Sequence, residues 1–270
     1  MSKTLAAIIA GFAGVIAFPQ KPRRRLVTLA GASHALQPII DVASDRGAMR
    51  FACPTPRSAH DPLGFGSDEP ETVAWLNDTV KSGTLWDIGA NVGIYTVYAA
   101  LSPDVNVVAI EPSAATFSVL VRNIELNALG AKVQPFCLAL DEVSRVAFLH
   151  MAHSEAGHAM HAFGAPKSIF GDINAVFAQP TLGLTIDQLA EFPGVWPPDY
   201  IKLDVDSIEA QILRGGRKTM ERVKSVIIEI MGEGEGPDGP LSALAELGFV
   251  ENVTFREMGG RNRVFDNGRP

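Results

Sequence analysis

The segment 87–111 contains acidic residues and glycines at the spacing of a ligand-binding loop. Asp87 ends an apolar run just before Gly89, and Glu111 follows the next apolar run. Gly89 and Gly93 flank Asn91, which gives G-x-N-x-G instead of the G-x-G-x-x-G of dinucleotide loops. A carboxylate beside this loop suits a cation better than a phosphate. S-adenosylmethionine, which carries a sulfonium and an ammonium but no phosphate, fits this charge pattern.

Glu111 lies where an acid can accept hydrogen bonds from both ribose hydroxyls of a bound nucleoside. Dinucleotide enzymes use an acid at the same place, so Glu111 alone does not separate the two ligands. A nicotinamide-dependent dehydrogenase therefore stays open as an alternative. The missing third glycine and the carboxylate of Asp87 count against it.

A second acidic cluster follows the apolar run at 200–205. Asp204 closes this predicted strand, Asp206 lies one step further on the same side, and Glu209 opens the next helix. Methyl transfer to a hydroxyl needs a group that orients the oxygen and takes its proton, and Asp204 is the first candidate. Lys202, on the same face, could pair with one of these acids. In the alternative interpretations, the aspartates only cap the helix, or the acids hold Mg²⁺.

Four of the six histidines lie within twelve residues, at His150, His153, His158 and His161. Because histidine is close to half-protonated at neutral pH, His158 is the second candidate for the base. The alternative is a solvated loop without a role in chemistry. The spacing H-x2-H-x4-H-x2-H matches no compact zinc pattern, and no cysteine supplements it, so we predict no metal site here.

Alternating strands and helices must position these groups. A helix is expected from Asp68, with Asp68 and Glu71 as a capping box, and Ser113 and Thr185 are expected to cap later helices. The predicted strands are 84–88, 105–110, 133–138, 145–149, 200–205 and 223–230. The other predicted helices are 92–101, 113–130 and 207–220. Residues 150–178 are expected to be irregular, and a hairpin is expected at 248–254 and 262–265. This alternation predicts an α/β fold with a mostly parallel sheet, in which ligands bind beyond the carboxyl ends of the strands.

Four segments, in order, resemble the FkbM-like, S-adenosylmethionine-dependent methyltransferases: "WDIGANVGIYTVYAA", "AIEPSAATFSVLVRNIELN", "LTIDQL" and "DYIKLDVDSIEAQILRGGRKTM" with "SVIIEI". The resemblance covers roughly residues 68–232. It implies a class I methyltransferase (Rossmann-like) fold with helices on both faces of a seven-stranded, mostly parallel sheet and an antiparallel terminal strand. It also implies methyl transfer to a hydroxyl of a sugar, glycan or natural product. The predicted cofactor-binding residues are Asp87, Gly89, Ala90, Asn91, Gly93, Glu111 and Pro112, and the predicted catalytic residues are Asp204, His158, Asp206 and Glu209.

The sequence departs from the family at one motif. Members of the family usually carry D-V-E-G-x-E after this strand, often with histidine before the final acid. Here the run is D-V-D-S-I-E, with Ser207 in place of the glycine and Ile208 in place of the histidine. The departure leaves open a second interpretation, a protein that binds S-adenosylmethionine but is catalytically impaired.

The composition predicts a single large domain with an extension, divided as residues 1–67 and 68–270. A net charge of −7 and a pI near 5.4 argue against a nucleic-acid partner. Two cysteines are too few for a disulfide framework, so the cytoplasm is expected. The uncharged run 5–18, followed by four basic residues within 21–25, is too short to span a bilayer. It is either a packing helix, a peripheral membrane contact through residues 5–25, or a signal or spanning segment.

Overall fold

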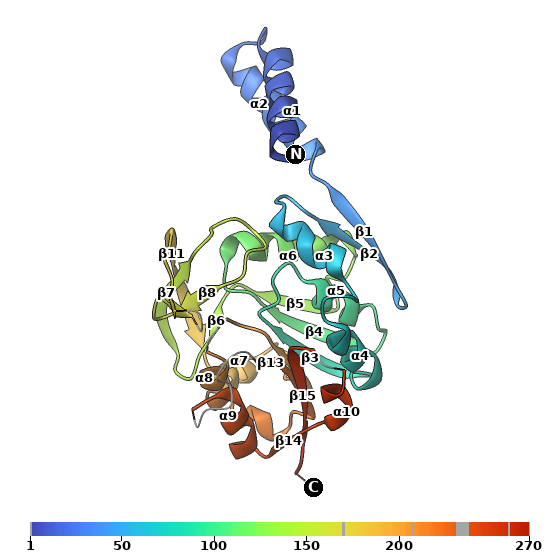
Figure 1. The fold of residues 1–270 in the computed structure, drawn as a ribbon, viewed down its shortest axis with the longest axis vertical. Helices are drawn as coiled ribbons and strands as arrows, with labels where there is room; N and C mark the ends of the chain where they lie inside the picture. The colour runs from blue at the N-terminus through green and yellow to red at the C-terminus, as the bar shows by residue number, and fades with distance from the viewer. Residues whose placement is uncertain (1, 169–170, 207, 231–237, 259, 270) are drawn as a thin grey trace. The chain divides into compact units, whose positions relative to one another are not determined.

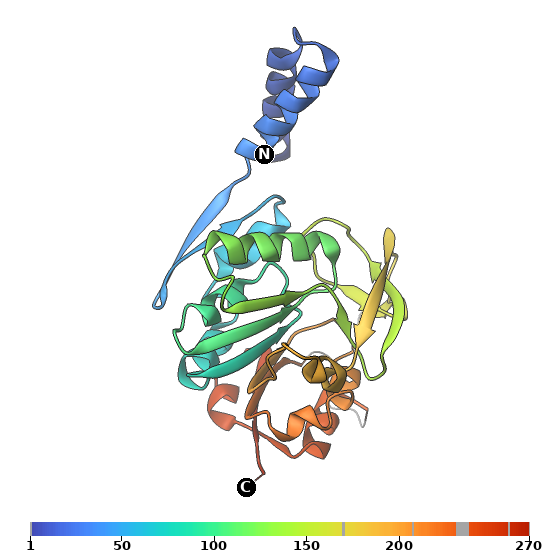
Figure 2. The ribbon, with the colours of Figure 1, turned by 180° about the vertical axis from the view of Figure 1, so that it is seen from behind.

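A central sheet of seven strands is the main feature of the computed structural model, which describes residues 2–168, 171–206, 208–230, 238–258 and 260–269. Its order is β14-β15-β13-β12-β3-β4-β5. β15 pairs antiparallel with both β13 and β14, and the other neighbouring strands pair in parallel. The predicted seven-stranded, mostly parallel sheet with an antiparallel last strand is thereby confirmed (Figures 1 and 2). The strands are β3 (Gly83–Ile88), β4 (Val105–Ile110), β5 (Val133–Phe136), β12 (Tyr200–Leu203), β13 (Ser225–Glu229), β14 (Phe249–Glu251) and β15 (Asn262–Asn267).

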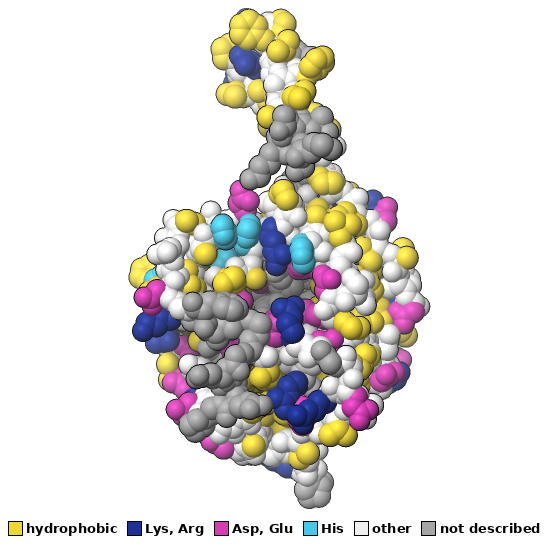
Figure 3. All heavy atoms as spheres, viewed as in Figure 1, with side chains coloured by type: hydrophobic (Ala, Val, Ile, Leu, Met, Phe, Trp, Pro, Cys, Tyr) yellow, Lys and Arg dark blue, Asp and Glu magenta, His cyan; other side chains and the backbone are white. Residues whose placement is uncertain are grey.

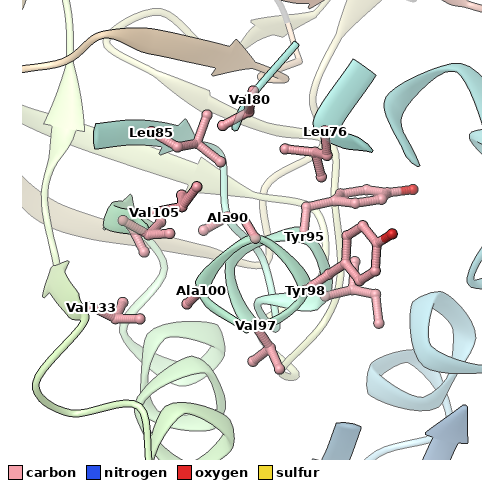
Figure 4. Close-up of a cluster of buried hydrophobic side chains, with 14 of the residues drawn as sticks. Leu76, Val80, Leu85, Ala90, Tyr95, Val97, Tyr98, Ala100, Val105 and Val133 are labelled. Atoms are coloured by element: carbon pink, nitrogen blue, oxygen red, sulfur yellow. The ribbon is translucent and has the colours of Figure 1, made fainter. Parts of the chain in front are cut away.

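Helices cover both faces of this sheet because its strands are apolar on both sides. Leu85 and Val105 belong to one buried cluster, whereas Trp86 and Val108 belong to the other. Figure 4 shows the first cluster, in which Leu85, Val105 and Val133 face α5. The helices of that face are α4 (Pro70–Asp78), α5 (Ile94–Ala100) and α6 (Ala114–Leu126), and those of the other face are α7 (Ile186–Glu191), α8 (Glu209–Arg214) and α9 (Pro240–Glu246).

The chain divides into two compact units, Met1–Ile39 and Ile40–Pro270. The first contains α1 (Ser2–Ala17) and α2 (Pro22–Ala35). Residues 40–67 belong to the second unit because β2 (Gly47–Ala52) packs against α6 and buries Met49 and Phe51 in the core. The short elements β1 (Ile39–Ser44), η1 (Arg57–Ala59) and α3 (His60–Gly64) flank that strand.

Two of the three predicted helix caps are confirmed. The side chains of Ser113 and Thr185 accept hydrogen bonds from the first turns of α6 and α7. The capping box at Asp68 and Glu71 is wrong. The helix begins at Pro70, and the Glu71 carboxylate is buried instead, where it accepts a hydrogen bond from the backbone N–H of Asn262 at 3.1 Å.

A second sheet of four strands borders the stretch 150–178 that the sequence predicts to be irregular, and of the described residues in that stretch only 150–151, 161–163 and 177–178 belong to the sheet. Its order is β6-β11-β7-β8, and β11 pairs antiparallel with β7 along its whole length. The sequence gives little sign of β11, because Pro180 and Gly183 interrupt its apolar pattern. These strands are β6 (Ala139–Leu140), β7 (Arg145–Met151), β8 (His161–Phe163) and β11 (Phe177–Leu184), with the short pair β9 (Lys167–Ser168) and β10 (Gly171–Asp172) before β11.

The helix predicted over 207–220 is split into α8 and η2 (Thr219–Glu221). Two closely packed glycines, Gly215 and Gly216, lie between these two helices. A Cβ on Gly215 would lie 2.4 Å from the carbonyl oxygen of Asp141, and one on Gly216 would lie 3.0 Å from Ile186. The carboxyl-terminal hairpin of β14 and β15 is confirmed, with α10 (Val253–Arg256) between its strands.

Candidate active site

A cavity of about 430 Å³ opens at the carboxyl ends of β3, β4, β12 and β13. Figure 3 shows histidine, basic and acidic side chains gathered around a hollow on this face of the second unit. Most of the predicted site residues line the cavity: Gly89, Ala90, Asn91, Glu111, Pro112, His158, Asp204 and Asp206. Asp87, Gly93 and Glu209 are not among its lining residues.

Glu111 is held rigidly at the end of β4. Its Oε1 accepts a hydrogen bond from the backbone N–H of Ser113 at 2.8 Å, and its Oε2 accepts one from the N–H of Asn91 at 3.1 Å. Its side chain is almost fully buried, and burial raises the pKa of Glu111 to about 7. Each carboxylate oxygen can accept a second hydrogen bond, so Glu111 can still bind a ligand's hydroxyl groups.

The glycine loop serves close packing between chain segments. A Cβ on Gly89 would lie 1.9 Å from the backbone oxygen of Asp204, so the glycine lets the ends of β3 and β12 meet. A Cβ on Gly93 would lie 2.4 Å from a Leu120 methyl, and Gly93 begins α5 with a φ of +87°. Gly89 and Asn91 line one wall of the cavity, whereas Gly93 does not line it and instead packs the loop against Leu120 of α6.

Asp87 lies beneath this wall, fully buried. Its Oδ2 accepts a hydrogen bond from the hydroxyl of Thr96 at 2.5 Å, and its Oδ1 has no hydrogen-bond partner among the described residues. Burial raises the pKa of Asp87, while the charge of Lys202 on the neighbouring strand opposes this shift. A buried carboxylate oxygen without a donor is unfavourable unless a water or a ligand meets it.

Asp204 and Lys202 form an ion pair inside the cavity. The Lys202 ammonium is buried and lies 2.6 Å from Oδ2 of Asp204. Burial alone would lower the pKa of Lys202, but the carboxylates of Asp204 and Glu69 outweigh this effect and raise it. The ammonium also lies 5.2 Å from the ring centre of Tyr95. The expectation that Lys202 pairs with an acid is confirmed, and the pair fixes the direction of the Asp204 carboxylate.

Asp206 anchors the histidine segment. Its Oδ2 accepts hydrogen bonds from the backbone N–H groups of Met160 and His161. His158 lines the cavity and stacks on His153, with ring centres 4.4 Å apart. Burial and the neighbouring His153 lower the pKa of His158, so its imidazole is mostly neutral at pH 7.

His161 also lines the cavity, and both of its ring nitrogens are buried without a hydrogen-bond partner among the described residues. Burial lowers the pKa of His161 to about 4, so the ring is neutral near pH 7. The sequence singled out His158 above His161, and the structure brings both to the same wall.

One wall of the cavity comes from residues that the sequence did not assign to the site. Glu229 is the last residue of β13, a position similar to that of Asp204 just after β12. Burial is the main cause that raises the pKa of Glu229 to about 7, and the charge of Asp204 adds to it. The rule that selected Asp204, an acid at the end of a predicted strand, could have found Glu229. The other charged residues of this wall, Arg57, Asp61, Glu69 and Arg261, come from loops and short helices that carry no such signal.

Another part of the cavity lining is apolar. Its side chains come from β3, β4, the β5–β6 region, the second sheet and α8. They would receive a flat, apolar ring such as adenine, next to the polar groups of Glu111. This lining comprises Ile88, Ile110, Leu138, Leu140, Leu149, Phe163, Ile208 and Ile212.

Glu209 lies on the first turn of α8. Burial, followed by the charges of Asp204 and Asp206, raises the pKa of Glu209 to about 8. Because the unfolded chain holds this carboxyl at an ordinary pKa, ionisation weakens the fold progressively as the pH rises from about 4.5 to 8. We expect Glu209→Gln, which stays neutral, to raise Tm at pH 8 by about 2–4 °C and to leave Tm at pH 4.5 unchanged. Thermal unfolding at both pH values measures this, and an equal shift at both would contradict the assignment.

Ser207, the residue that departs from the family motif, lies outside the described residues. Its neighbour Ile208 belongs to the apolar lining of the cavity. Among the described residues, no group of three or more histidine, cysteine, aspartate or glutamate side chains is arranged to hold a metal ion.

Comparison with known proteins gives a family match and distant relatives. The Methyltransferase FkbM domain matches residues 87–257. Hexuronic acid methyltransferase AglP of Haloferax volcanii is 27% identical over 183 residues, which cover 66% of this chain and 68% of AglP. Methyltransferase 1 of Beauveria bassiana is 28% identical over 158 residues, which cover 53% of this chain and 63% of that protein.

Solved structures match at lower identity. Precorrin-6y C5,15-methyltransferase from Geobacter metallireducens is 12% identical with a TM-score of 0.41, over 67% of this chain and 72% of that one. TrmK of M. capricolum, solved in complex with S-adenosyl-homocysteine, is 9% identical with a TM-score of 0.41, over 73% of this chain and 68% of that one.

Proposed function

The chain belongs to the FkbM methyltransferase family, and from this premise we propose that it transfers a methyl group from S-adenosylmethionine to a hydroxyl of a sugar, glycan or natural-product acceptor. One observation carries the proposal. A single cavity joins an apolar lining and the buried carboxylate of Glu111 to the Lys202–Asp204 ion pair. The first part suits a nucleoside, and the second suits a polar acceptor beside it.

The residues of the cavity fit S-adenosylmethionine. The apolar lining would hold the adenine, and Glu111 would accept hydrogen bonds from the ribose hydroxyls. Asp87 lies beneath the cavity wall and its buried Oδ1 lacks a donor among the described residues, so the carboxylate form of Asp87 would favour the cationic end of the cofactor through water. When bound, the cofactor supplies an electrophilic methyl group on a sulfonium.

Asp204 is the residue that we assign to the acceptor hydroxyl. An alcohol is a weak nucleophile until a base takes its proton, and Asp204 lines the cavity with its carboxylate direction fixed by Lys202. His158, whose ring is mostly neutral at pH 7, is the alternative base. Asp206 acts through the backbone by holding the segment that carries both cavity histidines.

The charged residues of the polar wall support the proposal that the acceptor is rich in hydroxyl groups. Asp61, Glu69 and Glu229 present carboxyl groups to the cavity, and such groups form hydrogen bonds with sugar hydroxyls. Hexuronic acid methyltransferase AglP, a relative at 27% identity, is named for a sugar substrate, which agrees with this assignment.

Ligand-dependent thermal unfolding tests the proposal against the dehydrogenase alternative. We expect S-adenosylhomocysteine at about 100 times its Kd to raise the free energy of unfolding by about 2.7 kcal/mol, and we expect NAD to leave the unfolding temperature unchanged. A radiolabelled-methyl assay with p-nitrophenyl glucoside, p-nitrophenyl glucuronide and polyol natural products then tests transfer. Stabilisation by NAD alone would exclude the proposal, and binding without transfer to any acceptor would favour the catalytically impaired interpretation.

A further inference from the structure

The amino-terminal unit, residues 2–39, carries an unusual distribution of charge. Residues 1–40 contain five lysine and arginine side chains and no aspartate or glutamate, whereas the other 230 residues contain 18 basic and 30 acidic side chains. Three arginines are consecutive, Arg23 to Arg25, at the start of α2. A cationic segment is therefore joined to a strongly acidic body.

The same unit leaves its large apolar side chains exposed. No residue of α2 is buried, although the two helices pack on each other. Figure 3 shows hydrophobic side chains with basic ones between them on the visible face of this unit. The exposed fractions lie between 47% and 73% for Ile8, Ile9, Phe12, Val15, Phe18, Leu26 and Val27.

A unit of this size cannot bury a sufficient core alone. Segments below about 40 residues need disulfides, metals or association with another surface for stability, and the first cysteine of this chain is Cys53. Phe12 and Val15 lie on one face of α1 and would lose contact with water only if a partner covered them. The apolar face thus requires a covering surface.

Charge decides which surface fits. A second copy of this unit would bring five cations against five, whereas a membrane with anionic headgroups complements both the cations and the apolar side chains. A helix of 16 residues spans roughly 24 Å, less than a hydrocarbon core of about 30 Å. None of the described helices is long and apolar enough to cross a membrane.

We propose that the helix pair α1–α2 binds the surface of anionic membranes, with its apolar side chains in the interface and Arg23, Arg24 and Arg25 at the headgroups. The proposal depends only on the amino-terminal unit, so it stands or falls independently of the proposed methyl transfer.

Vesicle sedimentation with the full chain tests this proposal. We expect binding to phosphatidylcholine vesicles with about 30% phosphatidylglycerol, and weak binding to phosphatidylcholine alone. Since each basic residue near an anionic surface contributes about 1 kcal/mol, the triple substitution R23S/R24S/R25S is expected to weaken binding on the order of 100-fold. Its control, R217S/K218S/R222S, makes the same charge change at exposed sites of the second unit and is expected to bind like the parent chain.

The apolar contribution has its own matched pair. F12S/V15S is expected to weaken vesicle binding at least tenfold, because it removes two exposed apolar side chains from the unit. The control V146S/F148S removes two exposed apolar side chains from the second unit and should leave vesicle binding unchanged. Val146 is 72% exposed there, which matches the 73% of Val15 in the first unit. Equal binding to both vesicle types, no binding to either, or a dimer in solution that F12S/V15S dissociates would each overturn the proposal.

Discussion

Asp204→Asn is expected to lower kcat about 1,000-fold while leaving the Kd for S-adenosylhomocysteine within about twofold, because the loss of a catalytic proton acceptor typically costs 10²–10⁴ in rate. The amide keeps the size of the side chain but cannot take a proton from the acceptor. Initial rates with the acceptor found in the labelled-methyl assay, and calorimetry with S-adenosylhomocysteine, measure the two quantities separately.

Asp141→Asn is the matched control. Asp141 is likewise paired with a basic side chain, Arg145 at 2.8 Å, but it is buried, whereas Asp204 is half-buried, and it does not line the cavity. Its substitution should affect Tm but not kcat. An Asp204→Asn enzyme within fivefold of the parent rate would exclude Asp204 as the base, and a matching loss in His158→Gln would then transfer the role to His158.

Glu111→Gln is expected to weaken S-adenosylhomocysteine binding about 100-fold, because hydrogen bonds to a charged group contribute about 1.5–3 kcal/mol each. Both carboxylate oxygens already accept a backbone N–H, from Asn91 and Ser113. The amide nitrogen of a glutamine would therefore face an N–H donor in either orientation. The change should thus disturb the loop as well as the ribose contacts.

The pH dependence of binding gives a second readout at the same residue. The carboxylate form of Glu111 is the hydrogen-bond acceptor, and burial raises its pKa to about 7. Affinity for S-adenosylhomocysteine should therefore increase as the pH rises from 6 to 8, by about tenfold, and level off above pH 8. In Glu111→Gln this dependence should disappear, and a flat profile in the parent protein would contradict the assignment.

Glu71→Gln serves as the control for Glu111→Gln. Glu71 is equally buried and accepts a backbone N–H, from Asn262, yet it lies outside the cavity. Calorimetry at pH 8 should give the parent Kd for this variant. If both variants lost affinity to the same extent, the effect of Glu111 would reflect the stability of the fold and not contact with the ligand.

Local patterns in the sequence predict a mostly parallel sheet and the cavity residues at the ends of three of its strands, whereas the count of seven strands comes from the family resemblance. Apolar runs that end in Asp87, Glu111 and Asp204 predict strands whose carboxyl ends meet at one edge, and the structure places these strands side by side. Periodicity and caps are local properties, which is why β4 and the start of α6 agree so closely with the prediction.

Long-range contacts decided the rest. The backbone N–H of Asn262 donates to the Glu71 carboxylate that the capping box would have used. β2 joins the second unit because Met49 and Phe51 are buried in its core and because two backbone N–H groups of β2 donate to asparagine side chains at α6. β11 is a strand because β7 offers it a full antiparallel edge, although its own residues carry no clear alternation. Apart from Glu229, the charged residues of the polar wall lie on both sides of residues 87–257, the region that the family match covers. Spacing along the chain reports which groups can share a helix or strand, whereas the approach of distant segments depends on side-chain packing that no local pattern encodes.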